Sequence, residues 1–147
     1  MYHLSPHFTM AEFTASQTAA RRGINNTPPP HIIPALTRTA EGLEQIRARL
    51  GVPILVSSGY RCLELNGLLG SKPTSQHALG EAVDFTAPGF GNPRNVVDAI
   101  ASADIDYDQL ILEFAHHGGG WVHVSFADHP RHAAFQLDGA GARPLYA

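Results

Sequence analysis

Apolar residues recur at near-helical spacing over residues 34–50, and Gly51 follows the last of them. This pattern predicts an amphipathic helix that ends at the glycine and turns its apolar side to the core. Earlier in the chain, Thr9 begins a Thr-x-x-Glu capping box, which predicts a helix over residues 10–22 closed by Gly23. The first third of the chain is therefore expected to be mainly helical.

Short apolar runs in the rest of the chain are typical of β-strands, at residues 53–58, 81–85, 110–114 and 121–126. The last two runs flank a glycine-rich segment, which predicts an antiparallel hairpin. Asn92 and Pro93 begin a helix expected to end near residue 103, and the tail adds an edge strand near residues 133–137. The expected fold class is α+β, a small antiparallel sheet with helices packed on it, in one domain spanning residues 1–147.

Composition narrows the classes of function. The net charge is -3 and no long run of Lys or Arg occurs, which argues against nucleic acid as a partner. No apolar stretch approaches the roughly 20 residues that span a bilayer, so we expect no membrane association. The N-terminus lacks the pattern of a secretory signal, and we expect synthesis in the cytoplasm followed by release or export. The single cysteine excludes an intrachain disulfide. We also expect the protein to be a monomer.

Nine histidines stand out, and the spacing of two of them suggests a metal site. His77 and Asp84 flank Gly80, which permits a sharp turn that folds both side chains toward one point, and His123 lies on the later hairpin strand. A catalytic zinc ion takes three nitrogen or oxygen donors from the protein and keeps one position for water. Spacing alone leaves open a buried histidine–aspartate pair that binds no metal.

The sequence resembles the M15 family of zinc peptidases. That family comprises D-alanyl-D-alanine carboxypeptidases, dipeptidases and the peptidoglycan endopeptidases of phages and bacteria. The resemblance extends from Leu4 to about Phe126 and is greatest to small phage and prophage members. It rests on separated segments in the same order, at residues 4–9, 57–61, 75–84, 108–113 and 121–125. It implies a Hedgehog/DD-peptidase-like fold and a Zn²⁺ cofactor held by His77, Asp84 and His123.

The resemblance also implies roles around the metal. Arg61 matches the arginine of a Ser-Gly-Tyr-Arg segment that faces the scissile carbonyl, where a fixed cation stabilises a developing oxyanion. Ser75 and Gln76 match a region that contacts the substrate peptide. Trp121 is expected to line the substrate cleft or to pack beside the metal. The alternatives are a structural salt bridge for Arg61 and a loop cap for Ser75.

The general base is where this sequence departs from the pattern of the family. Several relatives carry an acid three positions before the last histidine ligand, and here Gly120 occupies that position. Glu113, at the end of the preceding strand, is the expected substitute, provided that the hairpin register turns it toward the metal. His116 and His117 are the alternative proton carriers.

These features together predict a zinc metallopeptidase that hydrolyses peptide bonds in bacterial peptidoglycan, as a lysis-type endopeptidase of the stem peptide or cross-link. A D-alanyl-D-alanine carboxypeptidase is the alternative within the same chemistry. A non-catalytic zinc-containing module that binds peptide is the alternative of another class.

Overall fold

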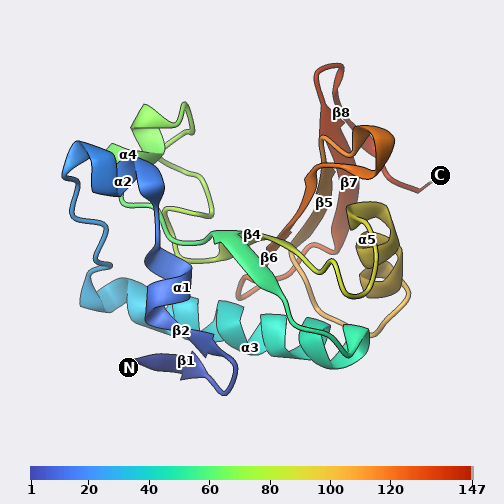
Figure 1. The fold of residues 1–147 in the computed structure, drawn as a ribbon, viewed down its shortest axis with the longest axis horizontal. Helices are drawn as coiled ribbons and strands as arrows, with labels where there is room; N and C mark the ends of the chain where they lie inside the picture. Colours follow the sequence, from blue (N-terminus) through green and yellow to red (C-terminus); the bar gives the residue numbers. More distant parts are fainter. Residues whose placement is uncertain (147) are drawn as a thin grey trace.

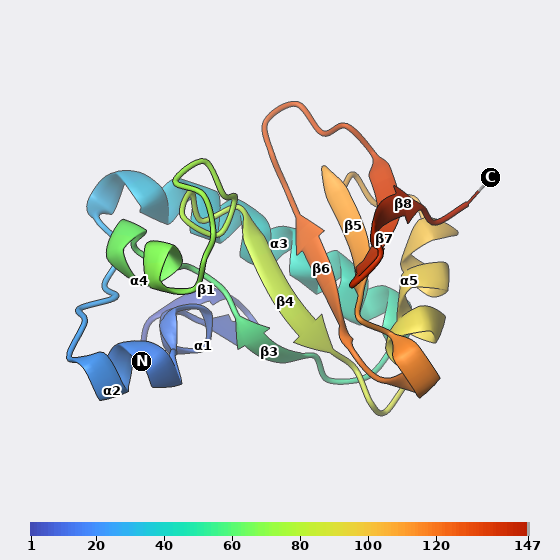
Figure 2. The same cartoon turned by 90° about the horizontal axis from the view of Figure 1, so that it is seen from above.

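The computed structural model describes residues 1–146, and a six-stranded sheet forms its centre (Figures 1 and 2). The strand order is β3-β4-β6-β5-β7-β8. Their bounds are β3 Leu55–Ser58, β4 Ala82–Thr86, β5 Gln109–Glu113, β6 Trp121–Ser125, β7 Ala133–Asp138 and β8 Gly141–Pro144. The α+β class is as predicted, and β5 and β6 form the expected antiparallel hairpin.

The sheet is larger than the sequence predicts, and it is mixed. The tail strand β7 pairs in parallel with β5, and β8 then folds back antiparallel on β7. This arrangement gives hydrogen-bond partners to the free edge of β5, which would otherwise be left unpaired. The tail strand expected near residues 133–137 is present as β7, but its parallel pairing with β5 differs from the expected antiparallel sheet. Apolar periodicity does not encode which edge a returning strand joins.

Two helices cover one face of this sheet (Figures 1 and 2). Helix α3 spans Ile33–Leu50 and ends at Gly51 in a left-handed cap, as predicted. Helix α5 spans Pro93–Ala101, with Asn92 as its N-cap. Their apolar sides pack against inward-facing strand residues, including Val83, Phe85, Leu110, Leu112, Val122 and Val124. The opposite face of the central strands is therefore left for polar chemistry.

The N-terminal segment lies beside α3 and contains two short helices rather than one. A small hairpin, β1 His3–Ser5 and β2 Phe8–Thr9, leads into α1 Met10–Thr14, and the predicted capping box is present. The continuous helix expected over residues 10–22 was wrong. It breaks at Ser16, whose hydroxyl caps a new helix, α2 Gln17–Arg22. Serine favours this position because its side chain replaces a missing backbone partner.

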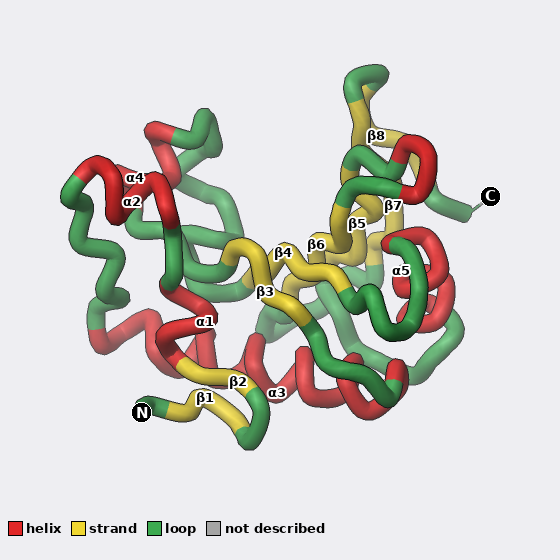
Figure 3. Tube along the Cα trace, viewed as in Figure 1, coloured by secondary structure: helices red, strands yellow, loops and turns green. Residues whose placement is uncertain are grey.

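Shorter elements complete the chain: the 3₁₀ turns η1 Pro30–Ile32 and η2 His116–Gly118, and helix α4 Leu63–Leu68. The segment between α4 and β4 is a loop (Figure 3). It carries the most informative motif of the sequence. Within residues 1–146, no helix has the length and apolar character needed to cross a bilayer.

Candidate metal centre

The strand register places two of the three predicted ligands side by side. Asp84 on β4 is directly opposite His123 on β6. The same row continues outward to Ser58 on β3 and to Ile111 on β5. Because side chains alternate across a sheet, this row points away from the face covered by α3 and α5. Pairing of distant strands therefore joins residues that are 39 positions apart.

The third predicted ligand, His77, is held by its loop. The loop turns at Gly80, whose φ of 76° is accessible to glycine and strained for other residues. A Cβ at this position would also crowd the side chain of Ile32. The Thr39 hydroxyl of α3 donates to the Gly80 carbonyl at 2.8 Å and fixes the turn against the core. Gly80 thus performs the role predicted from the sequence.

One hydrogen bond sets the orientation of the His77 ring, and a second holds its backbone. Its Nδ1 donates to the Gly59 carbonyl at 2.8 Å, and the Arg61 backbone N–H donates to the His77 carbonyl at 3.2 Å. Since a carbonyl only accepts, Nδ1 carries the proton and the lone pair of Nε2 faces Asp84, with 3.4 Å between Nε2 and Oδ2. An imidazole fixed through its second nitrogen is the usual arrangement of a metal-ligating histidine.

The three predicted ligands form a donor cluster, defined as His77, Asp84 and His123. Their donor atoms all lie within 4.8 Å of one another, and all three residues are buried. Donors of a tetrahedral zinc site lie about 3.4 Å apart. The two pairs that share Asp84 are separated by 2.9 Å and 3.4 Å. Within residues 1–146 no fourth His, Cys, Asp or Glu joins this group, so its size and chemistry fit a catalytic zinc ion.

Charge in the cluster favours a cation. Burial by itself would raise the pKa of Asp84, but the hydrogen bond from His123 and the nearby ring of His77 hold that pKa well below its usual range. Asp84 is therefore an anion that accepts from His123 on Oδ1 and faces Arg61 with Oδ2. A carboxylate in this state is ready to serve as a metal ligand without a protonation cost.

Arg61 lies against the same carboxylate. Its Nη2 is 3.5 Å from Asp84 Oδ2, and its other N–H groups donate to the hydroxyls of Ser58 at 3.1 Å and Ser71 at 3.2 Å. Burial lowers the pKa of Arg61, while the charges of Asp84 and Glu113 oppose that change. An arginine remains charged in such a setting. The cation is fixed beside the donor cluster, where the proposed oxyanion role needs it.

Glu113 faces the donor cluster as the hairpin hypothesis requires. It pairs with Trp121 across the hairpin, and its Oε1 lies 3.8 Å from His123 Nδ1. Burial, followed by the negative charge of Asp84, raises the pKa of Glu113, and His123, Trp121 and Arg61 oppose the rise. A raised pKa brings a carboxylate closer to the range of an effective general base.

Gly120 and the alternative proton carriers, His116 and His117, lie in the hairpin turn outside the donor cluster. Gly120 has φ of 79°, and a Cβ there would overlap the carbonyl oxygens of Glu113 and Phe114. The hairpin thus requires glycine where several relatives carry the acid. His116 lines a separate cavity of about 210 Å³ with Asp138, and His117 is exposed in the turn. The structure brings neither histidine into the donor cluster.

The residues predicted to contact substrate also form structural contacts. The Ser75 hydroxyl accepts from the His77 backbone N–H at 3.3 Å, which is the loop-cap alternative. Ser75 and Gln76 both line a cavity of about 280 Å³ that His123 also borders. Trp121 is half-buried and packs on Phe114, with ring centroids 5.4 Å apart. Substrate contact by Ser75, Gln76 and Trp121 stays a prediction.

A buried carboxylate next to this loop was missed by the sequence reasoning. Asp108 accepts from Gln76 Nε2 at 2.9 Å and from Arg131 Nε and Nη2 at 2.8 Å and 2.7 Å. The second amide hydrogen of Gln76 reaches Glu81 Oε1 at 3.2 Å. The residue next to His77 is thereby tied to β5 and to the chain after β6. The sequence feature that could have indicated this role of Asp108 is its position directly before a buried strand.

Replacing Asp108 with asparagine is expected to lower the free energy of unfolding at pH 7 by about 2 kcal/mol, as hydrogen bonds to a charged group are lost. The bonds from Arg131 lower the pKa of Asp108 to about 2 against the opposing effect of burial. The unfolded chain titrates near 3.9, so this stabilisation is complete above ~4 and is lost as the pH falls through about 2.

Urea unfolding at pH 7 and pH 3, with a chelator present, measures this effect. The difference between wild type and Asp108→Asn should shrink at pH 3 by about 1 kcal/mol. The matched control is Asp104→Asn, which alters an exposed aspartate. Equal behaviour of the two variants would contradict the prediction.

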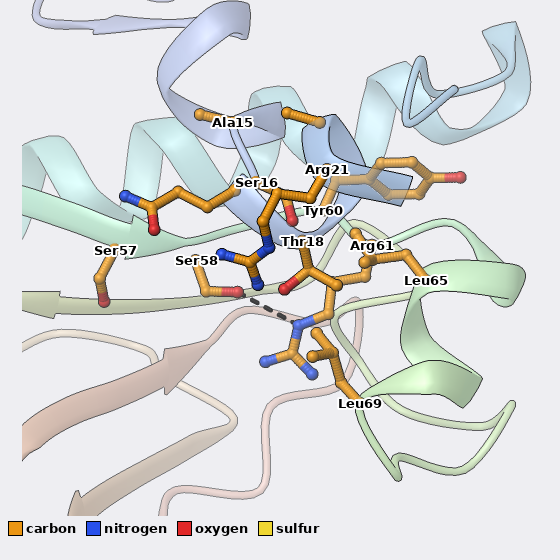
Figure 4. Close-up of a pocket in the computed structure, with 12 residues that line it drawn as sticks. Ala15, Ser16, Thr18, Arg21, Ser57, Ser58, Tyr60, Arg61, Leu65 and Leu69 are labelled. Carbon is orange, nitrogen blue, oxygen red and sulfur yellow. Dashed lines mark hydrogen bonds between the residues drawn. The ribbon is translucent and has the colours of Figure 1, made fainter. Parts of the chain in front are cut away.

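Two cavities lie near the donor cluster, one lined by Arg61 beside it and the other by His123 of the cluster itself. The larger, about 820 Å³, lies beside β3 and is lined by Ser57, Ser58 and Arg61 together with residues of α2 and α4 (Figure 4). The smaller cavity lies beside β5 and β6 and is lined by His123 and Ile111. Since β4 and β6 lie between β3 and β5 in the sheet, the cavities flank the cluster.

Comparison with known proteins agrees with this geometry. The sequence model of the Peptidase M15 family matches residues 6–125. The chain belongs to the Peptidase M15 family. M15 proteins are zinc peptidases, so membership supports peptidase activity and agrees with a His77–Asp84–His123 group that could hold the metal. No curated protein matches the chain.

Proposed function

We propose that this M15 chain is a zinc-dependent endopeptidase of bacterial peptidoglycan, of the type used in lysis. The observation that carries the proposal is the convergence of His77, Asp84 and His123, with Arg61 and Glu113 facing the same point. All five side chains come from one chain, which supports action as a monomer. The proposed peptidase domain spans residues 1–147.

Each residue has a role that its environment supports. His77, Asp84 and His123 would hold Zn²⁺, which would supply a Lewis acid that polarises the scissile carbonyl and acidifies a water molecule. Glu113 accepts the proton of the attacking water and delivers it to the departing amine. Arg61, held in place by Ser58 and Ser71, stabilises the negative charge that develops on the carbonyl oxygen.

The two cavities favour an internal cut over removal of a terminal residue. An endopeptidase must accommodate several peptide residues on each side of the scissile bond. One hollow borders Arg61 and another borders His123, so a chain can cross the donor cluster from β3 toward β5. In this pose Ser75 and Gln76 contact the peptide on the β5 side, and Trp121 stands beside Glu113. A carboxypeptidase needs only one extended side.

Mass spectrometry of purified peptidoglycan fragments, after incubation with the zinc-loaded protein, tests the proposal. We expect new termini within the stem peptide or at the cross-link, absent from a reaction containing chelator. Loss of a single terminal residue would instead establish the carboxypeptidase. A protein that holds zinc and yields no new termini would be the non-catalytic binding module.

A further inference from the structure

The lining of the larger cavity is positively charged. It contains two arginines, Arg21 and Arg61, and no acidic residue, although the chain as a whole carries a net charge of -3. The remaining lining is hydroxyl, amide and apolar side chains. Arg21 enters from α2 and Arg61 from the segment after β3, on two different walls of the same space (Figure 4).

The two arginines differ in how many of their N–H donors are already engaged by the protein. Arg61 is largely buried, and its N–H groups are engaged by Ser58, Ser71 and the carboxylate of Asp84. Arg21 is exposed, and within residues 1–146 its side chain forms no ion pair and no hydrogen bond. Arg21 is therefore the guanidinium of this cavity with donors to offer to a ligand.

The position of Arg21 at the end of a helix does not by itself explain why its side chain lines the cavity. Both Arg21 and its neighbour Arg22 lie in the last turn of α2, where a cation is favoured by the helix dipole. Only Arg21 lines the cavity. The dipole contribution is common to the two residues, and the contact with the cavity distinguishes them.

From this lining we infer that the cavity is a substrate subsite for a peptide segment bearing a free carboxylate, with Arg21 as the residue that selects it. The inference rests on the proposed function for the peptide and extends it to the chemical class of one segment. A guanidinium binds a carboxylate through paired, charge-assisted hydrogen bonds that a neutral carboxamide cannot reproduce. The peptide segment in question lies on the β3 side of the scissile bond.

The test compares two forms of one ligand. Disaccharide-peptide fragments released from peptidoglycan by a muramidase are used as such, or after conversion of their carboxylates to carboxamides. Affinities are measured by calorimetry on the zinc-loaded Glu113→Gln protein, which should bind without cutting. We expect about tenfold tighter binding of the carboxylate form, and a smaller preference at high salt.

The Arg21→Gln change should bring the ratio of the two affinities close to 1, while Arg21→Lys keeps part of the preference. Arg22→Gln, the matched control in the same helical turn, should keep all of it. Equal binding of both forms, or an equal loss of preference with Arg22→Gln, overturns the inference.

Hydrolysis of the same fragments by the wild-type enzyme separates this inference from the proposed function. Cleavage without discrimination between the two forms refutes the subsite and leaves the endopeptidase standing. Discrimination in binding without any cleavage refutes the endopeptidase and leaves a carboxylate-selective subsite.

Discussion

Replacing His77 with alanine should abolish zinc binding and reduce peptide hydrolysis by at least about a thousandfold. A three-ligand site loses most of its affinity when one ligand is removed, and the chemistry that depends on the ion is lost with it. The side chain also orders its surroundings, because its Nδ1 donates to the Gly59 carbonyl. Metal analysis of the purified protein and an assay on peptidoglycan fragments measure the two effects.

A second variant distinguishes loss of the ligand from loss of the fold. Asp84→Asn keeps the shape of the side chain and removes the charge that His123 and Arg61 face. Zinc at 100 times its dissociation constant should stabilise wild type by about 2.7 kcal/mol and both variants by much less. The matched control, His129→Ala, changes an exposed histidine and should behave as wild type. A His77→Ala protein with full zinc content and activity would show that the ion is held elsewhere.

Replacing Glu113 with glutamine should reduce kcat by about a thousandfold and leave zinc content unchanged, because general-base catalysis contributes factors of that order. The carboxylate faces the donor cluster without joining it, with 3.8 Å between its Oε1 and His123 Nδ1. Kinetics on fragments of defined composition, together with metal analysis, separate this result from the expected behaviour of His77→Ala.

The pH profile adds a second readout for Glu113. The base acts when ionised, so activity rises as the pH increases through its pKa. Burial and the charge of Asp84 raise that pKa in the metal-free site, and a bound Zn²⁺ would oppose the rise. The readout is therefore the loss of the acid limb of the profile in Glu113→Gln. Glu64→Gln, a change at an exposed glutamate of α4, is the matched control. Retained activity in Glu113→Gln would transfer the role of base to another group.

The backbone of the hairpin explains why position 120 carries no acid. Several relatives carry the acid three residues before the last ligand, but here the backbone at Gly120 is left-handed and closely faces the carbonyls of Glu113 and Phe114. A glutamate does not fit there without rebuilding the turn. The strand residue Glu113 presents its carboxylate from the other side of the same hairpin.

Local signals in the sequence were sufficient for several elements. The capping box at Thr9, the left-handed end of α3 at Gly51 and the N-cap of α5 at Asn92 depend on neighbouring residues only, and all three are present. The break at Ser16 was missed because a capping serine inside a helical stretch competes with helix continuation. The small N-terminal hairpin and α4 were missed because they are too short for periodicity.

The sequence by itself determined the family, the fold class and the motif that carries His77 and Asp84, because these depend on residue types at fixed local spacing. Only the tertiary structure decided that β7 runs parallel to β5, that the register turns Glu113 toward His123, and that Arg21 and Arg61 line one cavity. Strand register, edge choice and cavity walls arise from pairing between segments far apart in the chain. These arrangements are stabilised by contacts between distant segments, so no local stretch of sequence specifies them.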